Sequence, residues 1–511
     1  MRRSKVLEFN PGGVNVDSMP AALGPEVYSG AQNMRSTGSG MTRADGEIAF
    51  TPRVPGAPKW GIIFASNAAQ QLLAVGDAGC WVTDGGAWRD VTPAAGWLPF
   101  ESGTMSGGLL NGYPVFSAPG MVPWWYDGGA AVAPLPGWVA GQQCVCLAPF
   151  NQHIFAGSII AANLDNERLA WSDAATLGGV PVAWAPTTAN QAGDLYLGLG
   201  DGPVMTMLPL AQNLMVYRTR ACYAVSYSGR PYIYTARKVS GEVGAASQNA
   251  VAQIASAHIV MTPGDFIAWD GSSGRSLGDG RVKRSIFSQI SEEGLKRCHA
   301  YSVQSRNEIV FALALGRDDV CNMAYVWDVV RDRWSLRELP EITHTAAGIV
   351  PQLSTPKTWD NDAGPWESDT IPWDSPPQGG YKPAAAGFSP NKVQVFTLDA
   401  GDARADGGNI SASVERTGLM LDEEQTVKLV SAIYPRIQGT AGQAVSVQVG
   451  GQMAGGDPVA WGPAQDWLIG STKRVDCSIQ GRFVAVRFQG QGLAPWSVAG
   501  FGVEYQSRGL S

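Results

Sequence analysis

Five aspartates of this 511-residue chain follow aromatic residues at turns, and carboxylates set at regular spacing are the groups that general acid–base chemistry would use. An aspartate in a turn, however, normally accepts hydrogen bonds from its own backbone. We therefore expect structural roles for these side chains and no catalytic residue among them. They are Asp84, Asp127, Asp173, Asp270 and Asp328.

Three segments partly match catalytic or metal-binding motifs, but each lacks residues that its motif requires. The turn Asp84–Trp88 is similar to a sialidase Asp-box, which needs a serine two positions before the aspartate, where Val82 stands, and a tryptophan five positions after it. Gly271–Arg275 lacks the closing glycine of a GxSxG nucleophile motif. Asp360–Gly364 lacks the glycine and the glutamate of a calcium loop. We expect no active site, no metal site and no cofactor, and hence no enzyme.

Histidines and cysteines are too few and too scattered to form a triad or a zinc site. Of four histidines, His153 and His258 both open a strand of the repeat described below, which favours a packing role for each. The seven cysteines are odd in number and widely spaced, so we expect reduced, mostly buried thiols and assembly in a reducing compartment. Their positions are Cys80, Cys144, Cys146, Cys222, Cys298, Cys321 and Cys477.

The charge balance is unlike that of a protein that grips nucleic acid. The net charge is −7, and the short basic clusters lack interleaved aromatic residues for base stacking. A solvated face or an acidic protein neighbour is favoured for these clusters over nucleic-acid binding. They are Arg281–Arg284, Lys296–Arg297, and Arg331 with Arg333.

The aromatic-turn pattern predicts the main architecture. It recurs at intervals of 42 to 58 residues, close to the length of a four-stranded β-propeller blade. Abundant glycine, proline and tryptophan also favour short strands and tight turns. We predict an all-β chain with an irregular β-propeller of about six blades, and a helix over 285–297 as its best helical segment. The six instances begin at Trp81, Trp125, Trp171, Tyr227, Trp269 and Trp327.

Four regions follow from the patterns along the chain. Residues 1–55 have little periodicity and predict an extended N-terminal arm over other parts of the fold or over a neighbouring subunit. Residues 56–354 hold the propeller, 355–390 a linker rich in tryptophan and proline, and 391–511 strands that predict a C-terminal β-sandwich. No secretory signal and no apolar stretch of 18 residues is visible, so we expect a soluble chain without stable membrane insertion.

Three tryptophans mark the linker. Trp359, Trp366 and Trp373 recur every seven residues, but Pro365 and Pro372 exclude a helical heptad. We expect their rings to lie on a neighbouring surface. The contact is either between domains of one chain or between subunits.

Several segments together resemble the tail nozzle or hub proteins of short-tailed (podovirus-type) bacteriophages. The resemblance spans nearly the whole chain, includes the tryptophan repeat, and contains no catalytic motif. Its other segments are Asn10–Asn15, Ala31–Arg35, Val239–Ala245, Phe266–Gly271, Gly278–Val282, Tyr434–Ile437, Gly481–Phe488 and Gly500–Tyr505.

That resemblance implies a structural virion protein, assembled in the bacterial host cytoplasm and located in the virion tail. It implies a ring of six copies below the portal and adaptor, with tail fibres or spikes attached outside. Genome DNA would pass through its channel without sequence-specific binding, and an acidic lumen would repel the phosphates.

Two other functions stay open at this point. A receptor-binding or glycan-cleaving tail protein would use the propeller face as a sugar platform, and needs a carboxylate pair with exposed aromatics. A cellular propeller scaffold is the third possibility; the absence of a strict WD or kelch consensus weighs against it.

Overall fold

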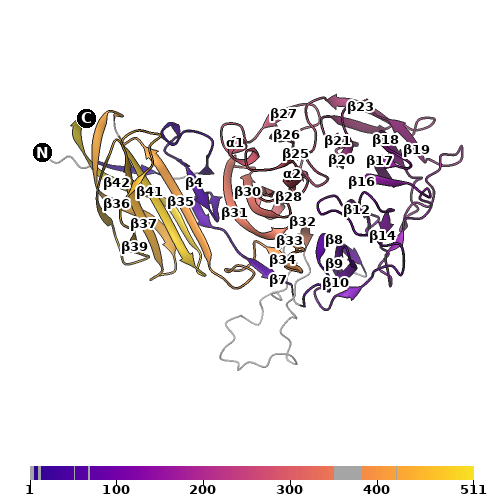
Figure 1. Ribbon diagram of the computed structural model, residues 1–511, viewed down its shortest axis with the longest axis horizontal. Coiled ribbons are helices and arrows are strands. Elements are labelled where there is room, and N and C mark those ends of the chain that lie inside the picture. Colours follow the sequence, from indigo (N-terminus) through magenta and orange to yellow (C-terminus); the bar gives the residue numbers. More distant parts are fainter. Residues whose placement is uncertain are drawn as a thin grey trace, which may run out of the picture.

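The chain consists almost entirely of antiparallel β-strands arranged in many small sheets, as the sequence predicts at this level (Figure 1). The computed structural model describes residues 5–9, 13–50, 52–66, 69–349, 383–421 and 423–510. Long strands that follow residue 410 form one half of the molecule, and the four-stranded sheets form the other. Within the described ranges, none of the helices has the length and apolar character that a membrane crossing requires.

Seven four-stranded units occupy residues 47–398 of the described chain, and we number them 1 to 7. Units 1 and 2 are β8 (Pro58–Ser66), β9 (Ala69–Gly76), β10 (Gly79–Thr83) and β11 (Arg89–Asp90), then β12 (Ser106–Leu110), β13 (Tyr113–Ser117), β14 (Trp124–Trp125) and β15 (Ala133–Pro134). Units 3 and 4 are β16 (Gln143–Phe150), β17 (His153–Ile160), β18 (Leu164–Trp171) and β19 (Gly193–Tyr196), then β20 (Val204–Leu210), β21 (Asn213–Arg218), β22 (Cys222–Tyr227) and β23 (Tyr234–Ser240). Units 5 and 6 are β24 (Val251–Ile254), β25 (Ala257–Met261), β26 (Phe266–Trp269) and β27 (Gly274–Ser276), then β28 (His299–Val303), β29 (Glu308–Leu313), β30 (Cys321–Asp328) and β31 (Arg333–Ile342). Unit 7 is β32 (His344–Ile349), β33 (Pro383–Ser389), β34 (Gln394–Leu398) and β7 (Glu47–Ala49).

Successive units pack against one another. Their first strands lie next to one another from β12 through β16 to β20, and from β28 through β32 to β8 (Figure 1). Buried apolar side chains fill the space between successive units. Unit 7 also packs on unit 1, since Phe388 shares a buried cluster with Leu72 and Trp81.

Tight hairpin turns let each unit fold from a continuous stretch of chain. The turn between β12 and β13 places Asn111 at φ 50° and Gly112 at φ 87°. Two successive left-handed residues define the hairpin turn whose twist matches the flanking strands, and Asn-Gly is its preferred sequence. Local sequence therefore determines this hairpin.

The aromatic-turn repeat corresponds to one strand of each unit. Its six aromatic residues all lie in the third strands of units 1 to 6. Unit 7 falls outside the six instances of the repeat. Phe396 of its third strand, β34, does lie three residues before Asp399, as Trp81 lies before Asp84, but the residue is a phenylalanine and the fourth strand comes from the N-terminal region. The sequence patterns therefore predicted about six units, and the described residues form seven.

Unit 7 is assembled from three distant segments. β7 pairs with β34 through Ala49↔Phe396, Ile48↔Thr397 and Glu47↔Leu398. β33 pairs with both β32 and β34. The unit thus runs across the boundaries at 55, 354 and 391 that the sequence patterns suggested, because strand pairing and not chain order defines it.

Helical structure is confined to short turns in the described residues. The predicted helix over 285–297 is instead two helices, α1 (Lys283–Phe287) and α2 (Glu292–Leu295). Ser291 interrupts the helix, because its backbone is extended. It caps α2 instead, with its side chain accepting a hydrogen bond from the Gly294 N–H. Two single-turn 3-10 helices are η1 (Pro20–Ala22) and η2 (Gln304–Arg306).

Two sheets of long strands pack face to face in the C-terminal half. Their contact is apolar, with the rings of Phe488 and Phe501 5.5 Å apart between centroids. One sheet contains β35 (Ile410–Leu419), β37 (Ala444–Gln452), β38 (Ala460–Trp461), β39 (Gln465–Leu468) and β41 (Phe483–Gly492). The other contains β36 (Thr426–Gly439), β40 (Val475–Gly481) and β42 (Trp496–Leu510).

The N-terminal arm links the two halves by adding strands to both. β4 pairs with β35, β5 pairs with β31 of unit 6, and β6 pairs with β5 and β42. Unit 6 and the second C-terminal sheet thereby become one ten-stranded sheet. The arm strands are β1 (Lys5–Phe9), β2 (Gly13–Val14), β3 (Val27–Tyr28), β4 (Gly30–Gln32), β5 (Met34–Thr37) and β6 (Gly40–Arg43), with β1 on β42 and β2 parallel to β3.

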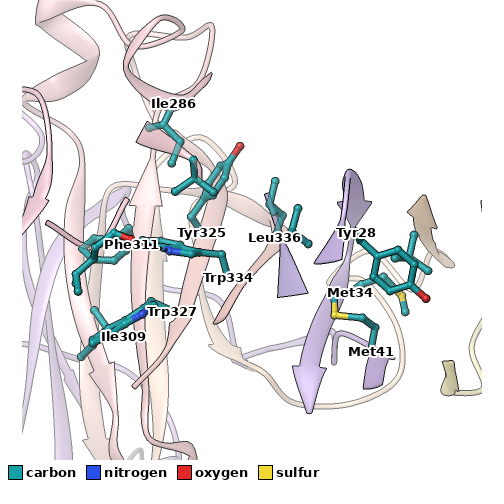
Figure 2. Close-up of a cluster of buried hydrophobic side chains, with 14 of the residues drawn as sticks. Tyr28, Met34, Met41, Ile286, Ile309, Phe311, Tyr325, Trp327, Trp334 and Leu336 are labelled. Carbon is teal, nitrogen blue, oxygen red and sulfur yellow. Dashed lines mark hydrogen bonds between the residues drawn. The ribbon is translucent and has the colours of Figure 1, made fainter. Parts of the chain in front are cut away.

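A buried core reinforces this link. Figure 2 shows Met34 and Met41 of the arm beside Tyr28, with Leu336 between them and the aromatic cluster of unit 6. In that cluster Trp334 and Phe311 lie 5.7 Å apart between ring centroids. Since one continuous apolar core spans the arm, unit 6 and the C-terminal sheets, these parts form a single packed body.

Candidate functional site

The turn aspartates hold their own hairpins, as predicted. Asp84 Oδ1 accepts a hydrogen bond from Gly86 N at 3.2 Å, and Asp127 Oδ1 accepts one from Gly129 N at 2.7 Å. Asp328 Oδ1 likewise accepts from the backbone of residues 330 and 331. Asp173 bonds Ala174 N and, across its loop, Gln191 N.

Asp270 is the most strongly engaged of the five. Its carboxylate accepts the backbone N–H groups of Ser273 and Ser272 at 2.7 and 2.8 Å and both serine hydroxyls. These bonds, led by the Ser273 backbone, hold the pKa of Asp270 well below its usual range. A carboxyl of this kind stays ionised and is not a general acid near neutral pH.

The histidines of the repeat are packing residues, which confirms the prediction for His153 and His258. Both are buried; His153 Nδ1 is 2.8 Å from Ser172 O, and His258 Nε2 is 3.0 Å from Pro209 O. Burial lowers the pKa of His258 to about 4. Its imidazole is therefore neutral at physiological pH.

His299 and His344 form a second buried group, which the sequence did not suggest. Their rings lie 5.9 Å apart, and His344 stacks on Trp60 at 5.4 Å, where units 6, 7 and 1 meet. His299 Nε2 lies 2.9 Å from the hydroxyl of Thr345, and Cys321 Sγ is 3.8 Å from its other nitrogen. In the described part of the chain, no three His, Cys, Asp or Glu side chains are placed to hold a metal ion.

Five of the seven basic side chains in the clusters form ion pairs within the described chain. Arg281 pairs with Asp332 at 2.9 Å, Lys283 with Asp265 at 2.8 Å, and Arg331 with Asp328 at 2.8 Å. Lys296 and Arg297 pair with Glu293 and Glu101. Intramolecular pairing leaves little of the positive potential that phosphate binding would require.

All seven cysteines are free thiols, and six are buried. Burial raises the pKa of Cys144 to about 12 and that of Cys477 to about 11. A thiol with so high a pKa is protonated at neutral pH and is a poor nucleophile.

The linker tryptophans Trp359, Trp366 and Trp373 lie outside the described residues. Their assignment to an inter-domain or inter-subunit contact stays a prediction.

A recess of about 240 Å³ lies where the arm crosses unit 6. Gly13, Asn15 and Glu26 line it from the arm, and Arg281 and Arg333 line it from the other side. Asp332 joins the two arginine-bearing segments, because Arg281 bonds both its carboxylate and its backbone carbonyl. Arg281 of this lining is already paired with Asp332, and the arm itself forms one wall of the recess.

Two ion pairs between the arm and unit 6 fix the arm further, and the sequence patterns did not reveal them. Arg35 Nε of β5 lies 2.6 Å from Glu308 Oε1 of β29, and the Glu308 carboxylate is only 5% exposed. Burial, partly offset by Arg35, raises the pKa of Glu308. A second pair from the arm joins Arg306 to Asp45 at 2.9 Å. Both pairs join residues more than 250 positions apart, so no local sequence signal could have revealed them.

Known proteins give little guidance. No family model matches the chain, and no curated protein matches it. The computationally designed protein Ika8 aligns with 76% of this chain and 99% of its own at 10% identity, with a TM-score of 0.38. A functionally unknown protein from Desulfotomaculum acetoxidans DSM 771 aligns with 54% of this chain and 88% of its own at 8% identity, with a TM-score of 0.33. At this similarity neither neighbour bears on function.

Proposed function

We propose that the seven units are the blades of a β-propeller and that the two C-terminal sheets are a β-sandwich. The packing of first strands from unit to unit supports the first assignment, and the face-to-face apolar packing supports the second. β7 would close the propeller, because it supplies the outer strand of the last blade from the opposite end of the chain. The last blade of such a propeller is then completed by a strand from the N-terminal region and not by the strand that follows it in the chain.

We further propose that the chain is a non-enzymatic structural protein of a phage tail, the subunit of a ring-shaped tail nozzle. The resemblance of its segments to nozzle proteins of short-tailed phages is the basis of this proposal. The observation that carries it is the ten-stranded sheet through which the arm unites propeller and sandwich. A subunit that must keep a fixed angle in a ring needs such a rigid connection between its halves.

In this proposal six copies form a ring below the portal and adaptor, in the virion tail, after assembly in the host cytoplasm. Tail fibres or spikes attach to its outer surface. The net charge of −7 per chain and the internal pairing of the basic clusters suit a conduit through which genome DNA slides without being held.

Cryo-electron microscopy of tails from virions whose genome encodes this chain tests the proposal. We expect six copies around a channel that is continuous with the portal. A single copy of the chain in assembled tails, a trimer at a fibre tip, or its absence from the virion would overturn the nozzle role.

A further inference from the structure

Two exposed apolar surfaces lie on opposite halves of the molecule, and neither has a partner within the described chain. The first, here the tyrosine face, belongs to units 3 and 4. It contains Tyr227, the last residue of β22, and Tyr232, from the turn between β22 and β23, and it adjoins the loop between β18 and β19, which exposes Leu177 and Val182. Leu177 is 98% exposed and Tyr232 is 74% exposed. Side chains this large are seldom exposed together on a monomer without an interaction to make.

Arg230 holds the two segments of the tyrosine face together. Its guanidinium donates to Thr188 O at 3.4 Å and to Ala189 O at 3.2 Å, which ties the turn to the loop. The ion pairs of the described chain do not include Arg230. The only charged residue of the loop 172–192, Asp173, bonds backbone groups. The face is therefore apolar, aromatic and positively charged.

Tyr227 shows that this face departs from the repeat. In the sequence repeat it corresponds to Trp81, Trp171 and Trp269, which are all at most 4% exposed, although the strand registers place the four residues at different distances from the hairpin turn. Tyr227 is 55% exposed and leans on Tyr234, with ring centroids 5.5 Å apart. The aromatic residue of the repeat is therefore buried at those three positions and exposed at Tyr227.

The second surface, here the methionine face, lies on the C-terminal half. It contains Met19, Met420 and Met453, each at least half exposed. The three lie close together because η1 packs on the ends of β35 and β37. Gly418 N donates to Gln452 Oε1 at 3.1 Å, and Arg416 donates to Pro20 O at 2.9 Å.

Acidic side chains surround the methionine face. Glu423 and Glu424 follow Met420 closely in the chain, and Asp457 bonds Ala454 N beside Met453. All three acids are exposed, and none takes part in an ion pair among the described residues. The face therefore combines flexible apolar side chains with negative charge.

We propose that the tyrosine face of one copy docks on the methionine face of the next. Charge supports this occupant, because Arg230 would meet the acidic rim. Side-chain chemistry supports it as well, since thioethers pack adaptably against aromatic rings. Because the two faces lie on opposite halves (Figure 1), the contact is heterologous and repeats from copy to copy. Closure of this contact into a ring rests on the nozzle proposal; the pairing of the faces does not.

Two complementary variants test the pairing. Tyr232→Asp disables the tyrosine face and Met453→Asp disables the methionine face, and both residues are exposed enough for the fold to tolerate the change. We expect the full-length wild-type chain to associate beyond a dimer, and each variant alone to be monomeric at tenfold higher concentration. An equimolar mixture should form a dimer and nothing larger, because one intact joint exists and both remaining faces are disabled. Mass photometry and analytical ultracentrifugation give the sizes.

Controls and charge reversal sharpen the result. Val330→Asp and Leu493→Asp alter exposed apolar residues outside both faces and should leave association unchanged. Arg230→Glu should weaken association at least tenfold, and adding Glu423→Arg and Glu424→Arg should restore it. Association that persists in both face variants, a mixture without dimers, or a wild-type chain that stays monomeric overturns the inference. If the variants still form rings, the pairing of the two faces is wrong but the nozzle proposal stands. If assembled tails contain a single copy of the chain, the nozzle proposal is wrong instead.

Discussion

At the scale of single residues, local hydrogen bonding was predictable and long-range pairing was not. Asp270 and Asp84 bond backbone groups two or three residues away, so their turn sequences are sufficient to assign them. His299 could not be assigned in this way, because its partners Thr345 and His344 come from another unit. What surrounds a buried side chain depends on the fold.

His299 carries a prediction about pH. Burial lowers its pKa to about 4, while an unfolded histidine titrates near 6.5. Between these values the unfolded chain binds a proton that the folded chain excludes, so the free energy of unfolding falls as pH falls through this window. The full effect is about 3 kcal/mol. The groups facing the ring are the Arg297 carbonyl, Thr345, Cys321, Tyr301 and His344.

His299→Gln removes this titration and can keep the bond to Thr345. Near pH 7.5 the variant should be less stable than the wild type, because the packing of the ring is lost. Its deficit should shrink toward pH 4.5, where the wild type bears the protonation cost. Urea unfolding at pH 7.5, 5.5 and 4.5 measures this, and a deficit that is constant across pH contradicts the assignment.

At the scale of elements, the repeat revealed units 1 to 6 but not unit 7. The third strands of units 1 to 6 carry a tryptophan or tyrosine before a turn, and that pattern is local. The strands β7, β32 and β34 come from three distant parts of the chain, so no periodicity joins them. Most C-terminal strands were predictable from their alternation. An arm over residues 1–55 was predicted as well, but its strand pairings were not, because an edge strand is selected by the sheet that receives it.

β7 yields a prediction at this scale. Phe50 N donates to Val395 O, and hydrogen-bonded pairs alternate along an antiparallel ladder, so the Ile48 N–H points at Thr397. Ile48→Pro removes this donor and should destabilise the chain by about 3 kcal/mol. Ile48→Ala is the matched control; since the side chain is 51% exposed, it should cost less than about 1 kcal/mol. Denaturant unfolding compares them, and equal losses would show that β7 does not close unit 7.

At the scale of the whole molecule, the arm makes two halves behave as one body. Its strands extend the sheet of unit 6 into the C-terminal half, and its ionic side chains reach into the same boundary. The backbone hydrogen bonds between paired strands set the relative orientation of the two halves, and the buried apolar core contributes most of the stability of their contact. The ion pair of Arg35 and Glu308 ties β5 to β29 across it.

Removing Arg35 tests how strongly that boundary depends on charge. Arg35→Ala leaves the buried Glu308 carboxylate unpaired, which should cost about 3 kcal/mol. The pKa of Glu308 is already raised by burial and rises further without Arg35. The folded variant then binds a proton more tightly than the unfolded chain, so its stability falls as pH rises, and its deficit should be larger at pH 8 than at pH 5.

Adding Glu308→Gln to Arg35→Ala should recover most of the lost stability. Lys296→Ala, which breaks an exposed pair, should cost less than about 0.5 kcal/mol in the same unfolding assay. A loss independent of pH, or a double variant as unstable as the two single losses combined, would mean that packing alone holds the halves together.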